Sequence, residues 1–130
     1  CMKKNVIISI KPQYVKQILN GTKKFEYRKS IFKQEVNRVY IYESSPHQRI
    51  VGYFKYSGTL SGTPHEIWES TSKFAGIDEA SYYKYFEKKE CAYAIKIKEV
   101  HMFNEAINPK ELIEGFVAPQ SYMYIEGDII

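Results

Sequence analysis

The spacing of hydrophobic residues predicts that the chain begins with a strand and a helix. Residues 6–10 are apolar and mostly β-branched, with only Ser9 interrupting them, which is typical of a buried strand. A helix should follow, because Pro12 suits a first helical turn and Gly21 a helix end. Between these two, apolar residues recur at helical spacing: Tyr14, Val15, Ile18 and Leu19.

The next residues alternate in side-chain character with a period of two, which predicts strands. In residues 24–29, Phe25 and Tyr27 point to one face of such a strand, and Lys24, Glu26 and Arg28 point to the other. Residues 39–42 and 50–56 are rich in β-branched and aromatic residues, and the turn-forming Ser44-Ser45-Pro46 lies between them. We therefore expect three strands in succession.

The middle of the chain carries helix-start signals. Thr63, Pro64 and Glu66 match a capping box with proline at the first helical position, and Asp78 can cap a second helix that runs towards Lys88-Lys89. Residues 93–98 then alternate as a strand with one solvated face. A short helix at residues 108–115 and a closing strand at residues 120–125 complete the pattern. This order predicts a mixed α+β domain built on a small, partly open β-barrel.

Length and composition add limits to this picture. The chain has 130 residues, which fits one domain over residues 1–130. No apolar run approaches the ~18 residues of a membrane span, and the N-terminus lacks the apolar segment of a signal peptide. The two cysteines, Cys1 and Cys91, exclude a disulfide scaffold, and the three histidines lack metal-ligand spacing. We expect a cytoplasmic protein without a metal or cofactor.

The charge of the chain is unevenly distributed. Residues 11–38 hold eight basic and two acidic residues, a net charge of +6, whereas the residues after Arg38 carry a net charge of −4. Such asymmetry suits a phosphate-binding surface, but an ordinary solvated lysine-rich face explains it equally well. If the N-terminal third binds an anion, Lys23 and Lys33 should contribute more than the later lysines: Lys73, Lys84 and Lys110.

One segment resembles a known family signature. Residues 21–28 read G-x-K-x-x-E-x-R directly after the first predicted helix, which resembles the signature of the ASCH family in the PUA-like superfamily. Residues 40–46 (YIYESSP), leading into residues 50–52, and residues 118–122 (APQSY) resemble the flanking segments of bacterial members. The resemblance extends from about residue 8 to residue 125.

The resemblance implies a fold and a range of functions. It implies a PUA-like pseudo-barrel with helices on its rim, and a cleft between the first helix and the barrel that binds RNA or a nucleotide-like ligand. A regulatory role in translation, RNA modification or transcription is the first hypothesis. The alternative is a small hydrolase, because one branch of the family hydrolyses N4-acetylcytidine and another is a ribonuclease. Lys23 matches the signature lysine of the first branch, but Glu26 stands where that branch has threonine.

The candidate site residues follow from the signature and its surroundings. We expect Lys23, Glu26 and Arg28 to line the cleft, with Lys23 and Glu26 as catalytic residues if the protein is an enzyme. Further contacts are expected from the residues Lys24, Tyr27, Ser44 and Ser45. Some of the abundant tyrosines can stack unpaired bases, although most belong to the core; the candidates on strands are Tyr27, Tyr40, Tyr42 and Tyr53.

The signature also has a purely structural interpretation. Lys24, Glu26 and Arg28 can form an exposed charge ladder, in which each pair contributes only ~0–1 kcal/mol. The two interpretations differ for Arg28→Ala. A ladder predicts a small effect on stability and none on binding, whereas a ligand contact predicts weaker binding with an intact fold.

Overall fold

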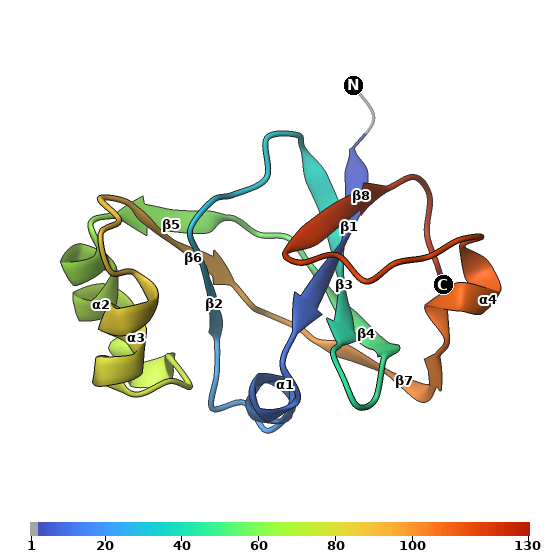
Figure 1. Ribbon diagram of the computed structural model, residues 1–130, viewed down its shortest axis with the longest axis horizontal. Helices are drawn as coiled ribbons and strands as arrows, with labels where there is room; N and C mark the ends of the chain where they lie inside the picture. Colours follow the sequence, from blue (N-terminus) through green and yellow to red (C-terminus); the bar gives the residue numbers. More distant parts are fainter. Residues whose placement is uncertain (1–2) are drawn as a thin grey trace.

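The computed structural model describes residues 3–130, so Cys1 and Met2 lie outside it. Within residues 3–130 it contains eight strands, four α-helices and one short 3-10 helix (Figure 1). In chain order these are β1 Lys4–Ile10, α1 Pro12–Leu19, β2 Phe25–Arg28, β3 Val36–Glu43, β4 Arg49–Lys55, β5 Thr59–Gly62, α2 Pro64–Thr71, η1 Ser72–Phe74, α3 Glu79–Tyr85, β6 Ala92–Lys96, β7 His101–Ile107, α4 Pro109–Leu112 and β8 Tyr122–Ile125.

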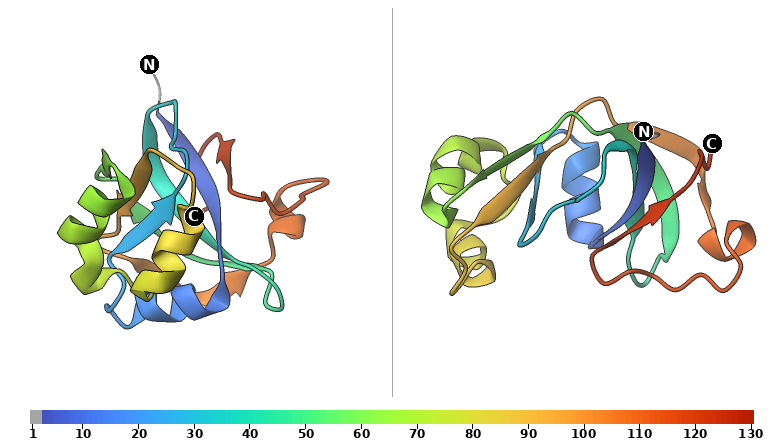
Figure 2. Two further views of the ribbon diagram at one scale, coloured as in Figure 1. Left: turned by 60° about the vertical axis from the view of Figure 1, so that its left-hand side comes forward. Right: turned by 90° about the horizontal axis from the view of Figure 1, so that it is seen from above.

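The strands form two sheets. Five strands pair in the order β7-β4-β3-β1-β8, and three pair in the order β2-β6-β5. β1 is parallel to β3, and the other pairs are antiparallel. Helices α2 and α3 lie at one end of the molecule and α4 at the other (Figure 2). Strands and helices are mixed along the chain, and the two sheets of the described residues do not close into a complete barrel. The prediction of an α+β fold with a partly open barrel is therefore confirmed.

The predicted helix starts are present with their hydrogen bonds. Thr63 Oγ1 accepts a hydrogen bond from the Glu66 amide at 3.1 Å, and Glu66 Oε1 accepts one from the Thr63 amide at 2.9 Å. Asp78 caps α3 by accepting from the Ser81 amide at 2.7 Å. These contacts satisfy amides that the first turn of a helix leaves without partners. Helix α3 ends earlier than predicted, and Lys88 adopts a positive φ of 64°.

The prediction of one solvated face on the strand at residues 93–98 is wrong. Ala94 and Ile95 are both fully buried, although they point to opposite faces of β6. β6 is the central strand of its sheet, with Ile95 in the core between the two sheets and Ala94 in the core beneath α2 and α3. The face of β6 that was expected to be solvated is covered by α2 and α3. The alternation of residues along the strand does not reveal such a layer, because it comes from other parts of the sequence.

Strands β5 and β7 were not expected. The residues of β7 are exposed or half-buried because it is the edge strand of its sheet, so it lacks the clear apolar alternation of a covered strand. β5 is short, partly exposed and contains Ser61 and Gly62. No helix in residues 3–130 is long and apolar enough to cross a membrane.

Candidate functional site

A cleft of about 790 Å³ lies where α1, β2 and α3 meet the ends of β1 and β3. Tyr14 contributes to it from α1, Tyr85 from α3, and residues 118–120 form the wall on the C-terminal side. Its volume is in the range of small-molecule and nucleotide sites. This is the cleft beside the first helix that the family resemblance implies.

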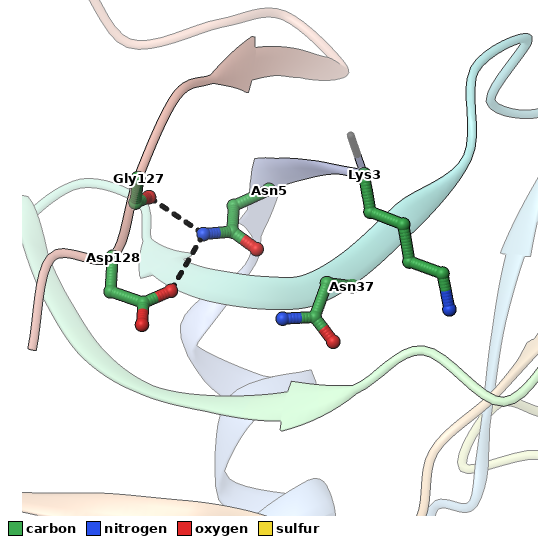
Figure 3. Close-up of a pocket in the computed structure, with 5 residues that line it drawn as sticks. All are labelled: Lys3, Asn5, Asn37, Gly127 and Asp128. Carbon is green, nitrogen blue, oxygen red and sulfur yellow. Dashed lines mark hydrogen bonds between the residues drawn. The ribbon is translucent and has the colours of Figure 1, made fainter. Parts of the chain in front are cut away.

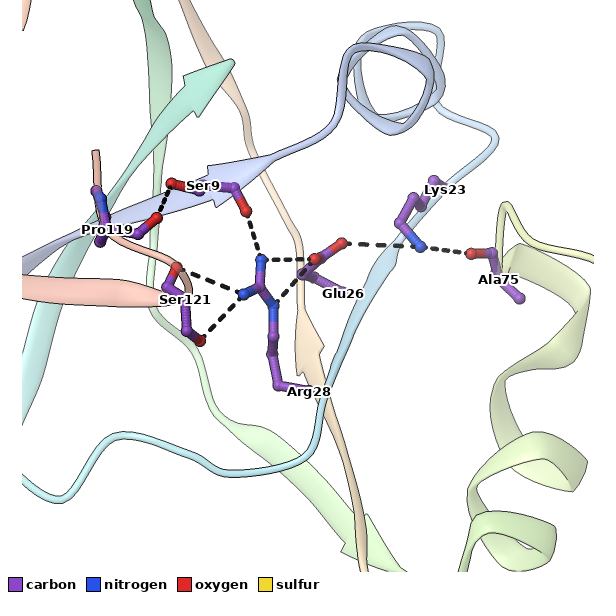
Figure 4. A network of polar contacts seen from close by, with 7 residues as sticks. All are labelled: Ser9, Lys23, Glu26, Arg28, Ala75, Pro119 and Ser121. Carbon is purple, nitrogen blue, oxygen red and sulfur yellow. Dashed lines mark hydrogen bonds and ion pairs between the residues drawn. The ribbon is translucent and has the colours of Figure 1, made fainter. Parts of the chain in front are cut away.

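Three charged side chains that line the cleft form one network (Figure 4). Glu26 Oε2 accepts hydrogen bonds from Arg28 Nη2 at 2.9 Å and from Arg28 Nε at 3.1 Å. Glu26 Oε1 lies 3.9 Å from Lys23 Nζ. The side chains are only 2% (Lys23), 10% (Glu26) and 12% (Arg28) exposed. They therefore form a largely buried network rather than an exposed charge ladder.

Arg28 also joins β2 to the opposite sheet. Its Nη2 donates to the Ser9 carbonyl at 2.6 Å, and its Nη1 donates to Ser121 Oγ at 3.1 Å (Figure 4). Ser9 Oγ in turn donates to the Pro119 carbonyl at 2.7 Å. Arg28 thus fixes the C-terminal wall of the cleft across the opening between the two sheets.

Lys23 links the signature to the segment before α3, on the other side of the cleft. Its Nζ donates to the Ala75 carbonyl at 2.6 Å, in the segment that leads into α3. The ammonium also lies 5.0 Å from the ring centre of Tyr14 and 4.9 Å from that of Tyr27. Such cation–π contacts favour the charged form of a buried amine.

Burial dominates the electrostatics of the site. It lowers the pKa of Lys23, with a smaller lowering by Arg28, while the Glu26 carboxylate acts in the opposite direction. Burial also raises the pKa of Tyr27 to about 12, partly offset by the hydrogen bond of its hydroxyl with Thr71 at 2.8 Å. The pKa of Tyr14 is raised by burial and by Glu26. The amine of Lys23 therefore loses its proton at a lower pH than the amine of an exposed lysine.

The structure brings most of the predicted site residues together. The six that line the cleft are Lys23, Glu26, Tyr27, Arg28, Ser44 and Ser45. Lys24 is not among the lining residues; it is exposed, and its ammonium lies 4.3 Å from the ring centre of Phe74. Lys24 immediately precedes β2, and its ammonium contacts Phe74, so it takes no part in the ion pairs of Glu26.

The tyrosines proposed for stacking separate into two groups. Tyr27 and Tyr42 line the cleft, although each is largely buried. Tyr40 is fully buried, and its hydroxyl accepts a hydrogen bond from the Ile129 amide at 3.0 Å, so it belongs to the core. Tyr53 lies outside the cleft and stacks on His101 with ring centres 4.9 Å apart.

Sequence reasoning missed the contribution of α3. The charge distribution gave Lys84 a minor role and Lys33 a larger one, but Lys84 lines the cleft and Lys33 is not among its lining residues. Ser81, Lys84 and Tyr85 all line it, at helical spacings of three and four residues. The spacing of these three residues was the signal for a shared helix face that the sequence contained. Only the fold shows that this face of α3 lines the same cleft as the signature residues.

A second pocket, of about 490 Å³, is formed by Lys3, Asn5, Asn37, Gly127 and Asp128 (Figure 3). Asn5 Nδ2 donates to the Gly127 carbonyl at 2.6 Å and to Asp128 Oδ1 at 2.9 Å. These bonds tie β1 to the C-terminal segment, which gives Asn5 and Asp128 a structural role. In residues 3–130, no three histidine, cysteine, aspartate or glutamate side chains are grouped closely enough to hold a metal ion.

Comparison with known proteins identifies the class to which this fold and cleft belong. Residues 8–101 match the ASCH domain, so the chain belongs to the ASCH family. The crystal structure of ZmASCH from Zymomonas mobilis superposes with a TM-score of 0.86 at 27% identity, covering 95% of this chain and 88% of that one. A tyrosine-to-phenylalanine mutant of the same protein gives a TM-score of 0.87 at 26% identity, covering 95% and 91%. The fold is therefore that of an ASCH, PUA-like domain.

Two curated relatives carry informative names. The ASCH domain-containing ribonuclease of Zymomonas mobilis is 28% identical over 97% of this chain and 87% of its own length. The large ribosomal subunit protein uL22 of Ureaplasma parvum is 27% identical over 93% of this chain, which spans only 39% of that protein.

Proposed function

We propose that residues 1–130 act as one ASCH domain that binds single-stranded RNA in the cleft beside the signature. The observation that carries the proposal is the combination of tyrosine rings and lysines around one cavity of about 790 Å³. Unpaired bases stack on aromatic rings, and lysines neutralise the phosphates. The names of the two relatives, a ribonuclease and a ribosomal protein, support an RNA ligand.

Cleavage of the bound RNA is the second candidate function. It is favoured by the relative named as a ribonuclease, which matches 97% of this chain. Within the cleft, Lys23 and Glu26 are the candidates for proton transfer, because the amine has a lowered pKa and the carboxylate lies 3.9 Å from it. If the chain only binds RNA, it is a regulatory module in translation, RNA modification or transcription.

Hydrolysis of N4-acetylcytidine is less well supported by this site. Glu26 occupies the position of that branch's threonine, and both its oxygens already face cations, Oε2 towards Arg28 and Oε1 towards Lys23. A hydroxyl at this position would leave Arg28 without its carboxylate partner. Incubation with N4-acetylcytidine should therefore release no cytidine.

Fluorescence anisotropy with a labelled oligouridylate tests RNA binding. We expect Tyr85→Ala to weaken binding by about 1–3 kcal/mol, the range of one base–aromatic stack, because Tyr85 is partly exposed in the cleft. Tyr83→Ala is the matched control, since Tyr83 lies on the same helix but packs near Trp68 instead of lining the cleft. A parent chain that does not bind, or equal losses in both variants, would refute the proposal.

Gel analysis of the same RNA over time tests cleavage. Product that accumulates with the parent chain and is absent with Lys23→Ala supports the second candidate. Intact RNA under conditions in which binding is saturated leaves binding alone as the function.

A further inference from the structure

We infer that the phosphates of the bound strand are held by Lys11 and Lys84, and that Arg28 of the signature is a positioning residue that contacts no phosphate. This inference rests on the proposed RNA binding and assigns its electrostatic part to residues outside the signature. Lys11 precedes α1 and Lys84 lies near the end of α3, so they come from two different elements around the cleft.

Arg28 has no free hydrogen-bonding edge. Its Nε and Nη2 donate to Glu26, Nη2 also donates to Ser9, and Nη1 donates to Ser121. A guanidinium offers five N–H donors in a fixed plane, and all three of its nitrogens have partners here. A phosphate would have to displace a carboxylate or a wall contact to bind it.

Displacing a partner of Arg28 would be strongly unfavourable. Glu26 is buried, and Arg28 is its nearest cation, at 2.9 Å against 3.9 Å for Lys23. Removing one partner of a buried ion pair leaves an uncompensated charge, which is strongly unfavourable. The side chain of Lys23 is only 2% exposed and donates to Ala75, so it too is engaged within the protein.

The charge that remains for a ligand comes from lysines outside the signature. The charged residues lining the cleft are Lys11, Lys23, Glu26, Arg28 and Lys84. Lys11 and Lys84 are exposed, and within residues 3–130 neither has a carboxylate oxygen within 4.0 Å of its ammonium. Glu26, the one acidic residue among those lining it, is neutralised by the signature cations. The signature network keeps one excess positive charge, because two cations share the carboxylate of Glu26, but both cations are buried and engaged within the protein. The two lysines therefore supply the exposed cations of the cleft.

The chemistry of lysine fits this assignment. Its ammonium is a mobile point charge on a flexible stem, which follows a phosphate whose position varies along a flexible strand. Tyr14 and Tyr85 line the same cavity and offer rings to the bases. Base stacking on the tyrosines and phosphate contacts from the lysines together define a single strand as the ligand, rather than a free nucleoside.

The test measures the affinity for a labelled oligouridylate over a range of salt concentrations. Lys11→Ala and Lys84→Ala should each weaken binding about threefold to fivefold at low salt. Each should also reduce the slope of log affinity against log salt by about 0.7, the share of one phosphate contact on a single strand. Lys84→Arg should restore both quantities, because it keeps the charge. Lys73→Ala and Lys110→Ala are the controls, since both lysines are exposed away from the cleft.

Arg28→Lys separates the positioning role from a phosphate contact. It should lower the melting temperature, because lysine cannot reach three partners at once, while the salt slope of the folded variant stays that of the parent. Binding by the parent with unchanged slopes in Lys11→Ala and Lys84→Ala would overturn the inference alone. Absence of RNA binding by the parent would refute the proposed function itself.

Discussion

Gly76 offers the sharpest test of how the wall of the cleft is built. It follows Ala75, whose carbonyl accepts the hydrogen bond of Lys23, and it has a φ of 68°. A Cβ at this position would lie 2.7 Å from Gln17 Oε1 and 2.8 Å from both Cβ and Cγ of Lys23. These Lys23 atoms are close to the backbone and cannot move aside freely.

The expected cost of Gly76→Ala has two parts. Left-handed backbone costs an alanine about 1–2 kcal/mol, and overpacking a close contact adds about 1–3 kcal/mol. The free energy of unfolding should therefore fall by about 2–5 kcal/mol. Gly115→Ala is the matched control, because Gly115 has the same φ of 68° and nothing within 4 Å of the added Cβ. Its cost should be only the backbone part.

Urea unfolding followed by circular dichroism measures both variants. The difference between them measures the close contacts of the added Cβ with Gln17 and Lys23, since the backbone cost cancels. Distortion of the cleft wall formed by Lys23 and Ala75 should also weaken RNA binding in Gly76→Ala, whereas Gly115→Ala should leave binding unchanged. Equal losses of stability in the two variants would refute the close packing of this segment on Lys23.

Three further predictions follow from individual contacts. Arg28→Ala should cost about 3 kcal/mol of stability in urea unfolding, because it leaves the buried Glu26 without its nearest cation and with only Lys23, 3.9 Å away; a loss well under 1 kcal/mol would instead support the exposed charge ladder. Folding favours the neutral form of Tyr27, whose pKa rises from 10.0 to about 12, so its stabilising contribution should be complete below pH 10 and lost as the pH rises to about 12. Tyr27→Phe should show a smaller alkaline loss of stability, and an identical loss would contradict this assignment. Thr63→Ala should lower the stability by about 1 kcal/mol through loss of the α2 cap, whereas no change in the melting temperature would show that the cap contributes nothing.

Features with local causes could be predicted from the sequence. The caps at Thr63 and Asp78 depend on residues within one helical turn, and both are present in the structure. Lys23, Glu26 and Arg28 could be placed in one cleft because residues 21–28 resemble the signature of the ASCH family, whereas their spacing alone also allowed an exposed charge ladder. For the caps, the residue types and their spacing already contain the contacts.

Features that depend on distant segments could not be predicted in this way. The partners that occupy Arg28 include Ser121, which is 93 residues away in sequence. The position of Lys84 at the cleft depends on how α3 packs, and the burial of Ala94 depends on the same helical layer. Net charge along the chain therefore pointed to the N-terminal third, whereas the unpaired charge of the cleft comes partly from α3.

The most direct test of the central claim is the site at which RNA binds. Titration of the labelled protein with oligouridylate, followed by backbone amide chemical shifts, reports that site residue by residue. We expect saturable shifts around Tyr14 of α1, Glu26 of β2 and Tyr85 of α3, which all line the cleft. Shifts confined to the pocket formed by Asn5 and Asp128, or to the exposed edge strand β7, would contradict this expectation.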